Sequence, residues 1–276
     1  MGLFGNSKNP EDYIYQGIAM LQDNKPKVAV NLFKKALKSE PKNVTALYNQ
    51  GLALNQMRKY QDAITCFDKV IEINPEDSPS YNNRAIAMAE LGDTDEALDW
   101  YDKAIKADAK YAPAHYNKGV LLDKKLRPDE ALKCLDNAIK IEPKKDNPKF
   151  YKGIVLGKMK KHEEALNCFQ NVYRNNRNHL DAYFQTGIQL AELDRHEQAL
   201  KVFDSILERY QKYKDNPHFI YAKSRSKAAL NETAEALTLL KIATKSKAGK
   251  IIKKWAAEDK AFDKLVGIPE FENIIK

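Results

Sequence analysis

Three asparagines, Asn49, Asn83 and Asn117, follow one another at intervals of 34 residues. An asparagine amide offers both a hydrogen-bond donor and an acceptor, and an extended peptide backbone needs both. A row of such amides can therefore hold a polypeptide segment without reading its side chains. If the three side chains share one surface, their chemistry favours non-covalent binding of a peptide.

The residue types that catalyse reactions or bind metals form no recognisable site. His162 and His196 are also 34 residues apart, in the expected turns between helices, and His115, His179 and His218 have no Cys or His nearby at ligand spacing. A phosphate loop, a glycine-rich nucleotide fingerprint and a nucleophile elbow are all lacking. The sequence predicts a non-enzyme that uses no cofactor and no metal. A cryptic enzyme stays an alternative, and it would need an unseen site; the sequence singles out no pair of catalytic carboxylates.

The cysteines indicate a reducing compartment. Cys66, Cys134 and Cys168 occupy one phase of the 34-residue period, which indicates a half-buried apolar position rather than redox or metal chemistry. The count is odd, and the N-terminus lacks the basic start and apolar stretch of a secretory signal. No apolar run approaches the ~20 residues of a membrane span. We therefore expect a cytoplasmic protein with no transmembrane segment.

The asparagines belong to a longer repeated pattern. In residues 44–77, two amphipathic helical stretches are joined near Met57–Gln61 and end at Pro75. A small residue in the first helix permits close approach of the second, whose large residue fills the space beside it. Three ladders of residues repeat at this interval: Gly17, Gly51, Ala85, Gly119, Gly153 and Gly187; Ala29, Ala63, Ala97, Ala131, Ala165 and Ala199; and Phe33, Phe67, Tyr101, Leu135, Phe169 and Phe203.

This unit resembles the tetratricopeptide repeat (TPR). The resemblance rests on Gly51, Ala63, Phe67 and Pro75 and covers about seven-eighths of the chain. It implies an all-α, right-handed superhelical solenoid of helix–turn–helix repeats with a concave groove. It also implies a non-catalytic protein–protein interaction scaffold.

The repeats define the expected domain organisation. Residues 1–9 form a short polar lead, and residues 10–250 form an array whose repeats start near 10, 44, 78, 112, 146, 180 and 217. The seventh repeat follows a three-residue insertion and is degenerate. Residues 251–276 are expected to form a C-terminal capping helix and a terminal turn, because the last repeat must be shielded from water. The alternative for this segment is a free amphipathic helix that binds a partner or a membrane.

The resemblance also implies which residues line the groove, since the first helix of each repeat faces it. Aromatic, amide and aliphatic side chains recur at its fifth, sixth and ninth places. The aliphatic residues have a second interpretation, as packing between neighbouring first helices, and asparagine is common at the sixth place for reasons other than binding. The expected groove residues are Asn49, Asn83, Asn117, Tyr48, Tyr116, Phe150, Phe184, Ile86, Val120 and Ile154.

The expected partner is a protein or an extended peptide. Relatives that capture chaperone C-terminal tails use a clamp of lysine, arginine and asparagine, and only Asn49 matches that pattern here. The equivalent places are otherwise Ile14, Ile18, Pro79 and Asn83. The sequence therefore argues against capture of a chaperone tail.

Positive charge is concentrated near the C-terminus. Residues 209–254 contain 12 Lys and Arg against 3 Asp and Glu, whereas the remainder of the chain has a net charge of −1. Such a region can bind nucleic acid or an anionic membrane, and this is one alternative function. Basic and aromatic residues do not alternate as in a known nucleic-acid module, so we do not expect nucleic-acid binding. A self-assembling structural protein is the other alternative.

Overall fold

The computed structural model describes residues 9–276, so the predicted polar lead lies outside the described residues except for Asn9. Every regular element in this range is a helix, which confirms the predicted all-α class. The chain divides into two compact units, one ending at Pro148 and the other starting at Lys149. None of the helices in residues 9–276 is long and apolar enough to cross a membrane.

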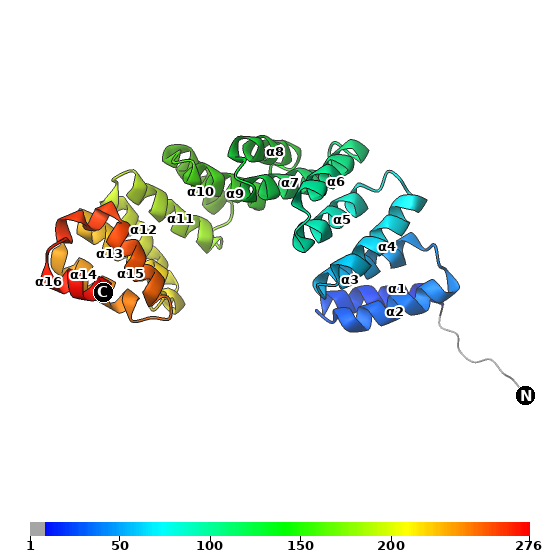
Figure 1. Ribbon diagram of the computed structural model, residues 1–276, viewed down its shortest axis with the longest axis horizontal. Helices are drawn as coiled ribbons and strands as arrows, with labels where there is room; N and C mark the ends of the chain where they lie inside the picture. Colours follow the sequence, from blue (N-terminus) through cyan, green and yellow to red (C-terminus); the bar gives the residue numbers. More distant parts are fainter. Residues whose placement is uncertain (1–8) are drawn as a thin grey trace, which may run out of the picture. The chain divides into compact units, whose positions relative to one another are not determined.

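The helices follow one another as antiparallel pairs (Figure 1). In the first unit they are α1 Pro10–Gln22, α2 Pro26–Ser39, α3 Val44–Gln56, α4 Tyr60–Ile73, α5 Ser78–Leu91, α6 Thr94–Ala107, α7 Ala112–Lys124 and α8 Pro128–Ile141. Helix α9, Asp146–Lys158, begins just before the second unit, which continues with α10 His162–Asn175, α11 Leu180–Glu192, α12 His196–Arg209, η1 Gln211–Tyr213, α13 Pro217–Ala229, α14 Thr233–Thr244, α15 Gly249–Glu258, η2 Lys260–Leu265 and α16 Pro269–Ile275.

Several first helices begin at a side-chain cap. The Oδ1 of Asn43 accepts a hydrogen bond from the backbone N–H of Ala46 at 2.9 Å, and the Oδ2 of Asp77 accepts one from Ser80 at the same distance. Each cap satisfies an N–H group that has no partner within its own helix. Pro10 and Pro217 occupy the first turn of their helices, where proline is tolerated.

The turn inside each repeat uses one residue in the left-handed backbone conformation. In the third repeat this residue is Gly92, with a φ of 100°. The other repeats place a residue with a side chain there, at φ values between 56° and 64°, and this conformation is costly for residues other than glycine. These residues are Asn24, Arg58, Leu126, Lys160, Asp194 and Asn231.

The contact between the two helices of a repeat depends on the small-and-large pairing expected from the sequence. Phe67 of α4 is fully buried, and its ring lies against Gly51 of α3. A Cβ atom at Gly51 would lie 2.6 Å from the Phe67 ring, closer than such atoms approach in proteins. At Gly119 the facing residue is Leu135, and the same atom would be 3.0 Å away. A larger residue in place of the glycine should therefore destabilise the repeats that place phenylalanine opposite it more than the repeat that places Leu135 there.

The C-terminal segment shares a hydrophobic core with the seventh repeat. Ile252 of α15, Phe262 of η2 and Phe271 of α16 are buried together with Leu240 of α14. The boundary predicted at residue 250 falls inside α15, which starts at Gly249. Residues 269–275 form the short helix α16 where the sequence predicted a turn, because Pro269 fits the first helical position and buried residues anchor one face.

Candidate binding site

The predicted groove residues of the first unit lie on its first helices. These helices contact one another directly, α1 with α3, α3 with α5 and α5 with α7, and they lie on the same side of their pairs (Figure 1). The predicted side chains are all half-buried, so part of each one is open to a ligand. In this unit they are Tyr48, Asn49, Asn83, Ile86, Tyr116, Asn117 and Val120.

The asparagines form hydrogen bonds within the protein. Nδ2 of Asn83 donates to the Tyr48 hydroxyl at 3.0 Å and to the Pro79 carbonyl at 2.8 Å. Nδ2 of Asn117 donates to Oδ1 of Asn82 at 2.9 Å. In both cases the residue at the sixth place of a first helix therefore donates to the residue at the fifth place of the first helix in the preceding repeat. Asn49 differs, because its Nδ2 donates to the carbonyl of Thr45 in its own helix at 2.8 Å.

Partial burial changes the acidity of two tyrosines in the first unit. Burial raises the pKa of Tyr48, as does the nearby carboxylate of Asp77, while the hydrogen bond from Asn83 lowers it. Burial likewise raises the pKa of Tyr116. Both phenols therefore stay neutral well above physiological pH.

In the second unit the predicted aromatic residues pack against the core, Phe150 edge-on and Phe184 at a tilt. The ring centroid of Phe150 lies 5.4 Å from that of Phe169, and the centroid of Phe184 lies 5.6 Å from that of Phe203. Tyr48 of the first unit has the same relationship to Phe67, at 6.0 Å. The fifth place thus combines core packing with a half-exposed face. Ile154 is half-buried and lines a hollow with Gln185 and Ile188.

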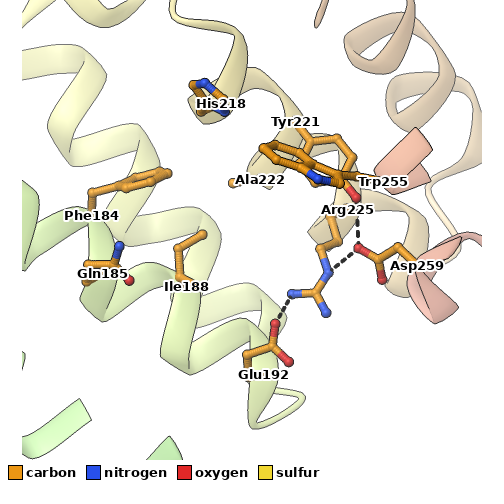
Figure 2. Close-up of a pocket in the computed structure, with 10 residues that line it drawn as sticks. All are labelled: Phe184, Gln185, Ile188, Glu192, His218, Tyr221, Ala222, Arg225, Trp255 and Asp259. Carbon is orange, nitrogen blue, oxygen red and sulfur yellow. Dashed lines mark hydrogen bonds and ion pairs between the residues drawn. The ribbon is translucent and has the colours of Figure 1, made fainter. Parts of the chain in front are cut away.

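A second pocket, of about 360 Å³, lies between α11, α13 and α15 (Figure 2). Its α11 side carries Phe184, Gln185, Ile188 and Glu192; its α13 side carries His218, Tyr221, Ala222 and Arg225; and α15 with the residue after it contributes Trp255 and Asp259. Of these residues, only Phe184 is among the ten expected groove residues.

An ion-pair network holds one end of this pocket. Nη1 of Arg225 donates to Oε1 of Glu192 at 2.6 Å, and Nε of Arg225 forms an ion pair with Oδ2 of Asp259, also at 2.6 Å. The Tyr221 hydroxyl donates to the same Oδ2 at 3.0 Å. Burial opposes the charge of Arg225, but Asp259 and Glu192 together outweigh it and raise the pKa of Arg225. Burial and the Asp259 charge raise the pKa of Tyr221.

A sequence signal for this pocket existed at one position. The ninth place of the first helix is aliphatic in the first six repeats and becomes Arg225 in the seventh. A buried guanidinium requires carboxylate partners, so this change predicts acidic residues nearby. Trp255 and Asp259 lie beyond the repeats, and their positions follow only from the docking of α15.

The remaining polar candidates have structural contacts. Nδ1 of His162 lies 2.9 Å from Oε1 of Gln189, and the carboxylate of Glu163 pairs with Arg195. Cys66 is buried, while Cys134 and Cys168 are half-buried. Among residues 9–276, no group of three metal-binding side chains comes together.

Comparisons with known proteins agree with this architecture. Models of the tetratricopeptide repeat match residues 44–77, 66–99, 112–145 and 151–214, and a model of the TPR repeat matches residues 87–125. Together these matches cover more than half of the chain. No curated protein sequence matches it.

Solved structures share the fold. The pilF protein of Pseudomonas aeruginosa has a TM-score of 0.66 at 21% identity, covering 78% of this chain and 97% of that chain. A tetratricopeptide repeat protein from Parabacteroides merdae has a TM-score of 0.60 at 18% identity, covering 89% and 96%. YrrB, described as a TPR protein with an unusual peptide-binding site, has a TM-score of 0.59 at 26% identity, covering 70% and 98%.

The fold and the family matches agree. The chain has repeated helix pairs with small residues packed against large ones, and tetratricopeptide repeat models match it. Proteins of this fold act as scaffolds for protein–protein interaction. The chain belongs to the tetratricopeptide repeat family.

Proposed function

We propose that this protein is a non-catalytic scaffold that binds an extended protein segment along the first helices of its first unit. The observation that supports this most is the arrangement of Asn49, Asn83 and Asn117. Each is half-exposed, and each Nδ2 group is held by an acceptor within the protein. For Asn49 and Asn83 the acceptor is a backbone carbonyl, which requires an N–H donor and so fixes which side of the amide is the oxygen.

The amide oxygens are then available to a ligand. Within residues 9–276, no hydrogen-bond donor is bonded to the Oδ1 atoms of these three asparagines. An extended segment presents backbone N–H groups that can donate to them. Half-buried Tyr48 and Tyr116, with Ile86 and Val120, supply apolar surface for its side chains.

A related protein supports a peptide ligand. YrrB, at 26% identity, is described as having an unusual peptide-binding site. The absence of the chaperone-tail cations from this sequence leaves backbone recognition as the mode that its residues suit best. We expect dissociation constants on the order of micromolar, because ordering an extended peptide offsets much of the contact energy.

The test begins with peptides selected from a displayed random library on the wild-type protein. The variant Asn49→Ala, Asn83→Ala, Asn117→Ala should bind them about tenfold more weakly or worse. The matched control Asn31→Ala, Asn137→Ala, Asn171→Ala changes exposed asparagines of second helices and should bind as the wild type does. Circular dichroism establishes that both variants fold. Unchanged affinity in the first variant would place binding elsewhere.

The basic region is a weaker candidate for the main binding surface. Three of its cations are already paired within the protein: Lys223 with Asp204, Arg225 with Glu192 and Asp259, and Lys227 with Glu232 and Glu235. We therefore propose that nucleic acid is not its ligand. Tight nucleic-acid binding at physiological salt, lost on charge reversal at Lys247, Lys250, Lys253 and Lys254, would contradict this.

A further inference from the structure

The pocket between α11, α13 and α15 has two aromatic walls. Figure 2 shows Phe184 on one side and Trp255 with Tyr221 on the other, while His218 borders one end. The ring centroid of Trp255 lies 5.6 Å from that of His218 and 5.8 Å from that of Tyr221. Trp255 is still 38% exposed, so much of its indole is not covered by the protein. The volume of about 360 Å³ is at the low end for a ligand site and suits one long side chain.

The charges that line the pocket do not balance. Two carboxylates, Glu192 and Asp259, face one guanidinium, Arg225. Asp259 is fully engaged, because its Oδ1 accepts from the N–H of Ala261 and its Oδ2 contacts both Tyr221 and Arg225. Glu192 uses only Oε1 on Arg225, and its side chain is 33% exposed. Within the lining of this pocket the surplus negative charge therefore lies on Glu192, which also borders two neighbouring hollows that Lys260 lines.

Aromatic walls beside an accessible carboxylate suit one kind of ligand. A cation over the face of Trp, Tyr or Phe is attracted by the ring quadrupole, and the methylenes that carry the cation pack against the same surface. A carboxylate at the end of such a channel adds a charge-assisted hydrogen bond. Lysine and arginine side chains combine an apolar stem with a cationic tip.

We propose that this pocket binds a lysine or arginine side chain of a partner protein, with its stem between Phe184 and Trp255 and its cation on Glu192. The proposal rests on the proposed function only in taking the ligand to be a protein segment. It uses none of the asparagines of the first unit.

The opposite arrangement, a ligand carboxylate on Arg225, is disfavoured by the same contacts. Arg225 already contacts two carboxylates, so a third would crowd three negative charges around one positive charge. The lysines of residues 241–254 do not line the pocket. Water separates their charges from a ligand in the pocket, and salt at 0.1 M screens such charges over ~10 Å. They should therefore repel a bound cation only weakly.

Trp255 provides the readout. The chain has two tryptophans, and Trp100 lies in the first unit, so Trp100→Phe leaves Trp255 as the only indole fluorophore. The probes are the amides of N-acetylarginine and N-acetyllysine, compared with those of N-acetylleucine and N-acetylglutamate. We expect the cationic probes to change Trp255 emission saturably, and the leucine and glutamate probes to produce no saturable change.

Glu192→Gln in this background should weaken the cationic probes about five- to tenfold, because the amide keeps the shape and loses the charge. Glu197→Gln, which alters an exposed carboxylate of α12 outside the pocket, is the matched control and should leave their affinity unchanged. Equal affinity in Glu192→Gln, no saturable response to either cation, or a preference for the glutamate probe would overturn the proposal. Because these probes do not involve the asparagine row, failure here is distinguishable from failure of the proposed function.

Discussion

Nδ2 of Asn117 donates a hydrogen bond to Oδ1 of Asn82, on the first helix of the preceding repeat, at 2.9 Å. The hydrogen bond from Asn83 to Tyr48 joins the corresponding places one repeat earlier. Asn82 is almost fully buried, so its carbonyl oxygen has little access to water if Asn117 is removed. These bonds connect consecutive repeats.

We therefore predict that Asn117→Ala lowers the free energy of unfolding by about 1–3 kcal/mol, because a buried acceptor is left unsatisfied. A double-mutant cycle with Asn82→Ala, measured by urea denaturation, should give a coupling energy of about 0.5–1.5 kcal/mol. Asn49 is the control, since its bond stays within one exposed helical turn, and Asn49→Ala should cost less than about 0.5 kcal/mol. A coupling energy near zero would mean that the Asn82–Asn117 bond does not stabilise the array.

The left-handed turn residues offer a stabilising substitution. Leu126 has a φ of 58° and is 88% exposed. Asparagine adopts this conformation more easily, as Asn24 and Asn231 do in their own repeats. Leu126→Asn should raise the free energy of unfolding by about 0.5–1 kcal/mol, observed as a higher melting temperature.

Two variants separate backbone strain from side-chain effects at this turn. Leu126→Ala removes the exposed side chain but keeps the Cβ atom, so it should give no gain. Gly92→Ala, at a φ of 100° with open space around it, should cost about 1 kcal/mol through the backbone alone. Equal melting temperatures for all three variants and the wild type would rule out strain at these positions.

Cys66 should make stability depend on alkaline pH. Burial raises the pKa of its thiol from 9.0 to about 11, and the thiol donates a hydrogen bond to Oε1 of Gln50 at 3.5 Å. A thiol with a raised folded-state pKa contributes stability that is fully present below pH 9 and is lost as pH rises towards 11. The stability difference between wild type and Cys66→Ala should therefore shrink from pH 8 to pH 11 in urea denaturation. A constant difference would show that this thiol ionises equally in both states.

The C-terminal segment should act as a cap. Deleting Gly249–Lys276 removes Ile252, Phe262 and Phe271 from the core that they share with Leu240, and it exposes apolar surface of α13 and α14. We expect aggregation or a lower melting temperature, measured by light scattering and thermal denaturation. A truncated protein that stays monomeric and melts at the wild-type temperature would show that these helices are not a cap.

The sequence by itself determined the repeat architecture, because a recurring residue type has the same packing role in each repeat. Ala63 and Phe67 recur at fixed intervals, and both are fully buried where their helices meet. Gly51 was predicted to permit close helix approach, and it lies against the Phe67 ring. These contacts are local within a repeat, so periodicity is enough to place them.

Only some of the turn residues are of a type from which the left-handed conformation can be predicted. Asn24, Gly92, Asp194 and Asn231 are residue types that favour left-handed turns, and their shared phase is a signal that the sequence predictions did not use. Leu126 does not favour that conformation. Its φ is imposed by the helices on either side, which pack against each other as they do in the other repeats.

Only the tertiary structure decided how the candidate sites are assembled. Whether Asn83 reaches Tyr48 depends on how consecutive first helices cross, and a spacing of 34 residues does not specify that crossing. The pocket in the second unit depends on α15, which lies outside the repeat pattern and brings Trp255 and Asp259 to Arg225. Periodicity predicts contacts inside the repeats, whereas contacts with a segment that has no period follow from docking alone, because shape and charge complementarity decide where it packs.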